Sequence, residues 1–238
     1  MPAVREQEMR RFWNERAHED AFYFVDTRQR YRRPDLVRFW DGDELVRFIL
    51  SELGLELNPN DRVLEIGCGI GRITRGLAAR AREVVALDIS DEMLRQAREL
   101  NPRLANVQWM QGDGVTLAGI DSDTIDACMS VVVLQHVPDP DIALGYMREL
   151  GRVLRPGGWA ALQISNDPAL HRPRDTLRHR AKALIGLGPR GQRHPAWLGT
   201  HVDLAAVARA ANEGGSRLER VWGEGTQYCV VLLRKPAA

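Results

Sequence analysis

The chain has 238 residues, of which 44% are hydrophobic and 27% charged, and its formal net charge is +1. These values are typical of one large globular domain with a substantial core. A near-neutral chain is not a general binder of polyanions, so nucleic-acid binding would require a local basic patch. We expect no secretory signal, because the N-terminal stretch is highly charged, and no apolar run reaches the roughly 18 residues of a membrane span.

The predicted elements alternate after a helical, aromatic-rich beginning at 3–52, which has breaks at Pro34 and Gly42. Expected strands are 62–67, 83–88, 106–112, 124–133, 159–165, 217–225 and 226–235, and expected helices are 71–81, 90–101, 139–154 and 201–215. Apolar strands that alternate with helices predict a mostly parallel α/β sheet covered on both faces. The last two strands have no helix between them, so one of them should run antiparallel.

A glycine-rich loop, VLEIGCGIGRIT at 63–74, follows the first predicted strand. Ligands of parallel sheets bind at the carboxyl ends of the strands, where strand order reverses. A dinucleotide fingerprint would place a third glycine where Arg72 stands. The loop instead has Glu65 followed by Gly67, Gly69 and Gly71, so we do not expect a dinucleotide.

Two acids stand at the ends of the next strands. Asp88 ends the second strand, where a carboxylate can accept hydrogen bonds from ribose hydroxyls, and Ile89 and Met93 follow it. Asp113 ends the third strand, within the sequence Gly-Asp-Gly, where it can accept from an exocyclic amine. Acids beside a glycine loop that lacks a P-loop lysine favour a nucleoside with an amino-acid tail over one with phosphates.

Five motifs in this order resemble those of the class I S-adenosylmethionine-dependent methyltransferases. They are 63–74, VVALDIS at 84–90, QGDG at 111–114, SVVVLQHVPDPD at 130–141 and LRPGG at 154–158. The resemblance implies a Rossmann-like, doubly wound, seven-stranded and mostly parallel sheet of order 3-2-1-4-5-7-6, with one antiparallel strand. It also implies S-adenosyl-L-methionine as the cofactor.

The same resemblance implies roles for individual residues. Gly67 would contact the methionine moiety, Asp88 would hold the ribose, Asp113 would meet the adenine amine and Glu65 would act through the loop or the amino group. The implied cofactor-binding set is Glu65, Gly67, Cys68, Gly69, Asp88, Ile89, Met93, Gly112, Asp113, Gly114, Val131 and Gln135.

Each of these signals has a structural alternative. The glycines could form only a tight turn, and Asp88 could cap the following helix. Met93 could be a core residue, and Asp113 could serve the turn at 112–114.

Methyl transfer is an in-line displacement in which the protein chiefly positions the reactants and excludes water. His136, just past the fourth strand, is the candidate general base for a hydroxyl or amine acceptor. The alternative is that His136 only fixes its loop. His171, His194, His201 and Tyr23 are lesser candidates.

We predict an N-terminal helical lid at 1–57 and a methyltransferase domain at 58–238, with an insertion at about 166–200. Trp13, Arg16, Tyr23 and Trp40 are the expected lid contacts to the substrate, the alternative being that they pack on the sheet. The insertion is basic, with Arg172, Arg174, Arg178, Arg180, Lys182, Arg190 and Arg193 against Asp175. It could be a solvated flap, a cap for an acidic acceptor, or a surface for RNA or anionic membrane.

We therefore expect a cytoplasmic methyltransferase that modifies an O, N or C nucleophile of a small molecule. The three cysteines, Cys68, Cys128 and Cys229, should be buried and reduced. No metal is expected, because the acids at 139–141 lie beyond the expected active face. Signatures of base methylases are absent, which argues against nucleic acid. The alternatives are an RNA methyltransferase that uses the basic 171–193 insertion and a non-catalytic protein that binds S-adenosylmethionine.

Overall fold

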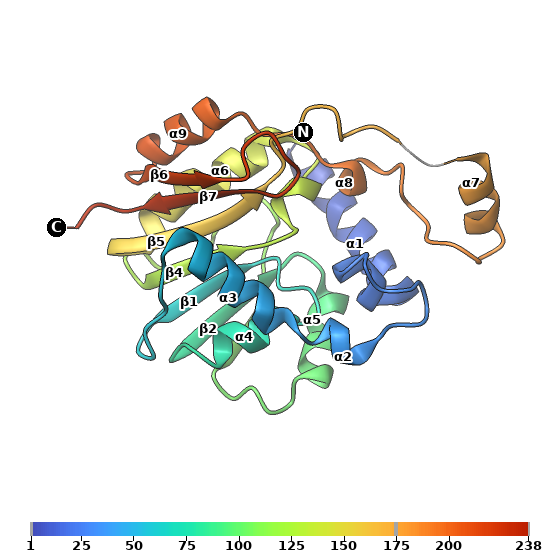
Figure 1. The fold of residues 1–238 in the computed structure, drawn as a ribbon, viewed down its shortest axis with the longest axis horizontal. Helices are drawn as coiled ribbons and strands as arrows, with labels where there is room; N and C mark the ends of the chain where they lie inside the picture. Colours follow the sequence, from blue (N-terminus) through green and yellow to red (C-terminus); the bar gives the residue numbers. More distant parts are fainter. Residues whose placement is uncertain (1, 174–175, 238) are drawn as a thin grey trace.

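The computed structural model describes residues 2–173 and 176–237 and centres on one sheet (Figure 1). Its strands are β1 (Arg62–Ile66), β2 (Glu83–Asp88), β3 (Val107–Gln111), β4 (Ile125–Ser130), β5 (Leu154–Ile164), β6 (Arg217–Trp222) and β7 (Cys229–Arg234). They lie in the order β3-β2-β1-β4-β5-β7-β6. β7 pairs antiparallel with β5 and β6, whereas the other neighbours pair in parallel. The predicted fold and strand order are confirmed.

Helices cover both faces of this sheet (Figure 1). In chain order they are α1 (Pro2–Val25), α2 (Leu36–Phe39), α3 (Gly42–Leu53), α4 (Thr74–Ala78), α5 (Asp91–Leu100), the short η1 (Leu134–His136), α6 (Pro140–Val153), α7 (Leu177–Leu184), α8 (Pro195–Leu198) and α9 (Leu204–Glu213). Leu64 on β1 joins the apolar cluster beneath α6 and α9, while its neighbour Val63 joins the cluster beneath α3 and α4. The inner strands β2, β4 and β7 are mainly apolar because both of their faces are buried, whereas the edge strands β3 and β6 carry exposed polar residues.

Helix α1 lies against the start of α5. The side chain of Asn14 donates to Asp91 Oδ1 at 2.7 Å, and Ser90 Oγ donates to Asn14 Oδ1 at 2.6 Å. The helix is kinked at Asp20, which has non-helical backbone angles. These contacts bring the end of α1 over the carboxyl ends of the strands. The division into a lid and a main domain stays a prediction.

Three elements differ in extent from the prediction, each for a backbone reason. Gly69 and Gly71 have φ of 53° and 89°, so the helix predicted at 71–81 forms only as α4. The strand predicted at 124–133 ends with β4, because Val132 turns the chain with φ of 60°. The strand predicted at 159–165 begins earlier, because β5 follows α6 directly at Leu154; its pairing with β4 then jumps to Trp159, and Gly157 has φ of 81° in the bulge between.

The segment 166–200 extends from the body and carries α7 and α8 (Figure 1). Arg174 and Asp175 lie outside the described residues, as do the side chains of Arg178 and Arg180. Arg172, Lys182 and Arg190 are exposed. In the described part of the chain, no helix is long and apolar enough to cross a membrane.

Candidate active site

An inner pocket lies at the carboxyl ends of β1, β2 and β4. Its empty volume is about 970 Å³, including the space at its open mouth. Its floor is the glycine loop, where the backbone N–H groups of Gly67 and Cys68 donate to Leu87 O at 2.7 and 3.0 Å. Gly67 has φ of 76°, and a Cβ built on it would lie 2.3 Å from a methyl group of Val133. A glycine is therefore required here both for backbone conformation and for space.

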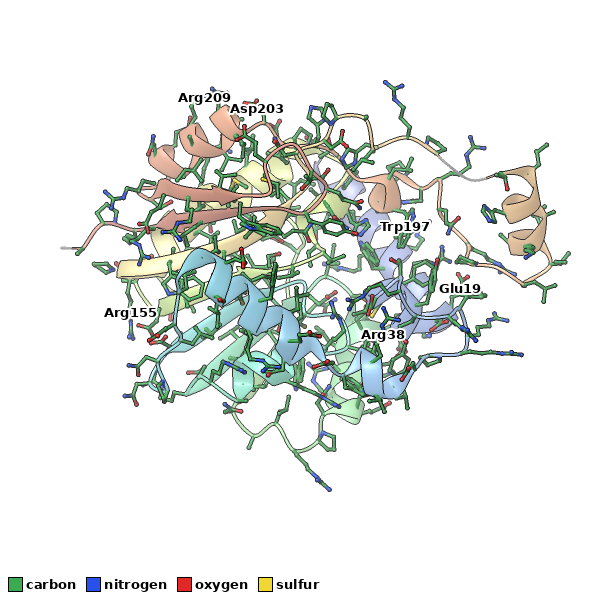
Figure 2. The ribbon with its side chains drawn as sticks, viewed as in Figure 1. Glu19, Arg38, Arg155, Trp197, Asp203 and Arg209 are labelled. Carbon is green, nitrogen blue, oxygen red and sulfur yellow. The ribbon has the colours of Figure 1, made fainter. Side chains whose placement is uncertain are left out.

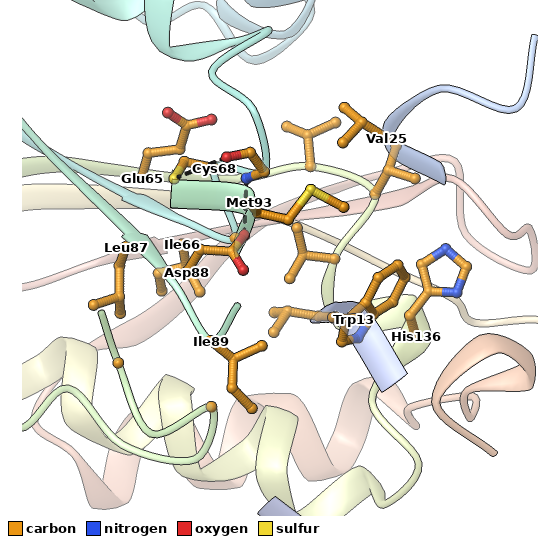
Figure 3. A pocket seen from close by; sticks show the side chains of 18 of the residues that line it. Trp13, Val25, Glu65, Ile66, Cys68, Leu87, Asp88, Ile89, Met93 and His136 are labelled. Carbon is orange, nitrogen blue, oxygen red and sulfur yellow. Dashed lines mark hydrogen bonds between the residues drawn. The ribbon is translucent and has the colours of Figure 1, made fainter. Parts of the chain in front are cut away.

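Asp88 joins β2 to this loop (Figure 3). Its Oδ2 accepts from the backbone N–H of Gly69, and its Oδ1 accepts from that of Ser90, both at 2.8 Å. Ser90, rather than Asp88, caps α5 by accepting from the N–H of Met93 at 3.0 Å. Burial raises the pKa of the Asp88 carboxyl. Asp88 thus lines the inner pocket and fixes the position of the glycine loop.

Glu65 is a second carboxyl in the inner pocket. Its Oε2 accepts from Thr74 Oγ1 at 2.6 Å, and its side chain is 3% exposed. Burial, with a smaller effect from Asp88, raises the pKa of Glu65 to about 7. A carboxyl with this pKa changes ionisation near neutral pH and would ionise fully beside a cation.

The far end of the inner pocket is mainly apolar. Ile89, Met93, Gly112 and Gly114 line it. Met93 also packs in an apolar cluster, so its two proposed roles are compatible. Asp113 turns toward its own loop instead, where Oδ1 accepts from the N–H groups of residues 115 and 116 at 2.8 and 2.7 Å. These contacts are those of the turn alternative, and the Asp113 side chain is not among the described residues that line the pocket.

An outer pocket adjoins the inner one and is larger, with about 1970 Å³ of empty space counted to its mouth. Its walls come from the end of α1, from α3, from the 166–200 segment and from the strand pair β6 and β7. Trp197 of α8, labelled in Figure 2, is one of its aromatic walls. The pockets share six described residues, which are Phe24, Val25, Arg72, Val131, Val132 and His136.

His136 stands at the junction of the two pockets, close to Trp13 (Figure 3). Its Nδ1 lies 2.8 Å from the carbonyl oxygen of Trp197, and its Nε2 lies 3.1 Å from the amide nitrogen of Gln135. Because a carbonyl only accepts, Nδ1 carries the proton and Nε2 keeps a lone pair. Burial lowers the pKa of His136 to about 4, so the imidazole is neutral at pH 7.

Gln163 organises the polar wall around His136, and the sequence did not single it out. Its Oε1 accepts from the N–H of Val132 at 2.6 Å, and its Nε2 donates to Gln135 Oε1 and to Gln227 O, each at 2.8 Å. Gln135, expected beside the cofactor, lines the outer pocket rather than the inner one. The feature of the sequence that could have indicated this role is the lone glutamine within the apolar run of β5.

The expected lid contacts separate into two groups. Trp13 lines the inner pocket. Arg16 is buried over the rings of Phe12 and Phe24 and pairs with Glu19 Oε2 at 3.0 Å. Neither pocket is lined by Arg16, Tyr23 or Trp40, all of which the structure describes. Tyr23 packs against Tyr31 within the N-terminal region, whereas Trp40 packs under Arg75 and so joins that region to α4.

The remaining histidines are held by other contacts. His171 lines the outer pocket, where its Nδ1 donates to Leu198 O at 2.7 Å and its Nε2 meets Ser165 Oγ at 2.8 Å. His194 stacks on Phe12 and accepts from the N–H of Ala196. His201 is exposed. Within 2–173 and 176–237, no cluster of three or more His, Cys, Asp or Glu is arranged to hold a metal ion.

The glycine loop, the acids that follow it and the strand order together define a class I fold, and comparison with known proteins agrees. Residues 64–162 match the family described as "Methyltransferase domain". This match and the strand order support a class I S-adenosylmethionine-dependent methyltransferase, with S-adenosyl-L-methionine as the cofactor.

Individual relatives match this chain over only part of its length. The chain is 36% identical over 129 residues to a malonyl-[acyl-carrier protein] O-methyltransferase of Pectobacterium atrosepticum, covering 54% of this chain and 46% of that protein. It is 27% identical over 177 residues to a ubiquinone biosynthesis O-methyltransferase of Paracidovorax citrulli, covering 74% and 70%. In four curated relatives, the match spans 22–48% of the relative's own length.

A solved structure resembles the whole chain. This is phosphoethanolamine N-methyltransferase 1 of Haemonchus contortus in complex with phosphoethanolamine and S-adenosylhomocysteine. The TM-score is 0.71 at 18% identity, and the match covers 100% of this chain and 50% of that one. At this identity the likeness concerns the fold.

Proposed function

We propose that this protein is an enzyme that transfers a methyl group from S-adenosylmethionine to an O, N or C nucleophile of a small molecule. The observation that carries the proposal is the junction of the two pockets at Val131, Val132 and His136. In-line displacement needs a nucleophile and a sulfonium on opposite sides of one methyl group. A donor in the inner pocket and an acceptor in the outer pocket meet this requirement.

The inner pocket has the chemistry that the donor needs. Glu65 would accept from the ammonium of the methionine moiety, and the backbone near Gly67 would contact that moiety. Asp88 would accept from the ribose, and Ile89 and Met93 would border the adenine. Trp13 would close the pocket as part of a lid at 1–57, which excludes water from the reacting atoms.

His136 is the proposed general base. It is neutral at pH 7, and the lone pair on Nε2 is the one that a base must present. The Gln135 amide now faces that lone pair, so an acceptor hydroxyl would replace or share this contact. A pKa of about 4 makes His136 a weak base, so it would take the proton late, as the methyl group is transferred and the acceptor becomes most acidic.

Calorimetry with S-adenosylhomocysteine and, separately, with NAD tests whether the protein binds the proposed methyl donor. We expect S-adenosylhomocysteine to bind and NAD not to bind. Mass spectrometry of a bacterial metabolite extract incubated with enzyme and methyl-labelled donor tests the acceptor half. A labelled small molecule is the expected product. Label found only in added RNA would favour the RNA alternative, and binding without any label transfer would favour the non-catalytic one.

A further inference from the structure

Arg72 is a buried cation that faces both pockets. It follows the glycine loop, is only 4% exposed, and lines the inner and the outer pocket. Its Nε and Nη1 are buried and have no hydrogen-bond partner among the residues that the structure describes. Leaving a buried guanidinium without acceptors is unfavourable, because its N–H groups lose water and gain nothing in return.

The nearby carboxyls are already engaged. Asp26 is bound by Arg28, whose Nε donates to Oδ1 at 2.8 Å and whose Nη2 donates to Oδ2 at 3.0 Å. Glu65 accepts from Thr74 and is only partly ionised at pH 7. The guanidinium of Arg72 therefore has free N–H donors, which suit an anion that binds from outside the chain.

The residues that line the outer pocket also favour an anion. Its described lining has the arginines Arg28, Arg72 and Arg172 and the single carboxylate Asp26. This excess of positive charge attracts an anion, and the aromatic walls offer apolar surface beside it. A planar fork such as Arg72 suits carboxylate or phosphate, since both accept two parallel hydrogen bonds.

We propose that Arg72 is an acceptor-binding residue and that the methyl acceptor is a small anion whose carboxylate or phosphate group pairs with it. This inference rests on the proposed function, because it assigns the outer pocket to the acceptor. A competing assignment pairs Arg72 with the carboxylate of the cofactor. The two differ in which ligand loses affinity when Arg72 is changed.

Calorimetry with three probes tests the proposal on the full-length protein, first alone and then saturated with S-adenosylhomocysteine. The probes are benzoate, phenyl phosphate and benzamide, which share a ring and differ in charge and shape. We expect at least one of the two anions to bind about 10- to 100-fold more tightly than benzamide. The tighter anion identifies carboxylate or phosphate as the group recognised.

Arg72→Met should abolish this anion preference and leave the affinity for S-adenosylhomocysteine within about threefold, because the methionine side chain keeps the packing volume. Arg209→Met, on α9 (Figure 2), is the matched control and should keep the preference. If Arg72→Met does not fold, Arg72→Lys keeps the charge, loses the fork and should give an intermediate preference.

Equal binding of all three probes to the wild-type protein would overturn the inference. So would an Arg72→Met variant that keeps the anion preference but loses affinity for S-adenosylhomocysteine, since Arg72 would then serve the cofactor. A wild-type protein that does not bind S-adenosylhomocysteine contradicts the proposed function itself. That failure is separate, because the probes are also measured without the cofactor product.

Discussion

His136 donates its Nδ1 proton to the backbone carbonyl of Trp197 at 2.8 Å, and the two rings stack with centroids 5.2 Å apart. This contact joins η1 to α8 across a gap of 61 residues. It fixes the tautomer of His136 and aims Nε2 at the junction of the pockets. The 166–200 segment therefore takes part in positioning the candidate base.

His136→Asn tests the base. Asparagine keeps a donor for Trp197 O but has no basic nitrogen, so kcat should fall by about 10²- to 10⁴-fold. The affinity for S-adenosylhomocysteine, from calorimetry, should change little. His18→Asn, at an exposed position, is the control and should keep full turnover. Unchanged kcat in His136→Asn would leave His136 with the loop-fixing role alone.

Glu65 makes stability depend on pH. Its pKa is about 7 in the folded protein, above the 4.5 that is ordinary for a glutamate, so the folded state holds this proton more tightly. The stability contribution is complete below about pH 4.5 and is lost as pH rises through 7. Glu65→Gln should therefore gain up to about 3 kcal/mol relative to the wild type between pH 5 and 8.

Thermal unfolding of both proteins across this pH range measures the effect. Glu56→Gln, at an exposed position, should show no such trend. A difference between Glu65→Gln and the wild type that does not vary with pH would mean that Glu65 is ionised throughout.

Gln163→Leu replaces a hydrogen-bonded glutamine with an apolar side chain of similar size. The N–H of Val132 and the amide oxygen of Gln135 would lose their partners, which costs about 1–3 kcal/mol per buried group. Because Gln135 in turn faces His136 Nε2, kcat should fall along with the melting temperature. Enzyme assays below the melting transition separate the two effects. A lower melting temperature with unchanged kcat would show that Gln163 is only structural, and the exposed Gln108→Leu serves as control.

The fold and the inner pocket were largely predictable, because local patterns encode them. Apolar strands that alternate with helices specify a parallel sheet, and such a sheet brings the loop at Gly67 and the end of β2 to one edge. The helix predicted at 90–101 forms as α5, where Ser90 accepts from Met93 N–H, and such a cap depends only on neighbours in sequence. For Asp113 the sequence left two alternatives open, and the contacts found are those with its own turn.

The outer pocket was not predictable, because its polar contacts join distant residues. Gln163 meets residues 28 and 64 positions away, and no pattern within one segment reveals such pairs. Arg72 entered the sequence argument only as an obstacle to a dinucleotide. Its burial at the boundary of two pockets depends on how α1 and the 166–200 segment enclose the strand ends.

Gly67→Ala tests how closely the loop must approach its neighbours. The added methyl group would lie 2.3 Å from Val133 and would also hold alanine at φ of 76°. Gly157→Ala is the matched control, because Gly157 has φ of 81° but no atom within 4 Å of the added carbon. Both variants should lose about 1–2 kcal/mol to left-handed strain. Gly67→Ala should lose more, since Val133 must move.

The two variants should differ further in cofactor binding. In Gly67→Ala, the shift of Val133 displaces the wall between the pockets, so the affinity for S-adenosylhomocysteine should fall at least about tenfold. Gly157→Ala should bind as the wild type does, and adding Val133→Ala to Gly67→Ala should restore part of the affinity by making space. Calorimetry on all three variants measures this. Equal affinities in Gly67→Ala and Gly157→Ala would show that the loop does not border the cofactor, because the clash at Val133 would then be absorbed away from the bound ligand.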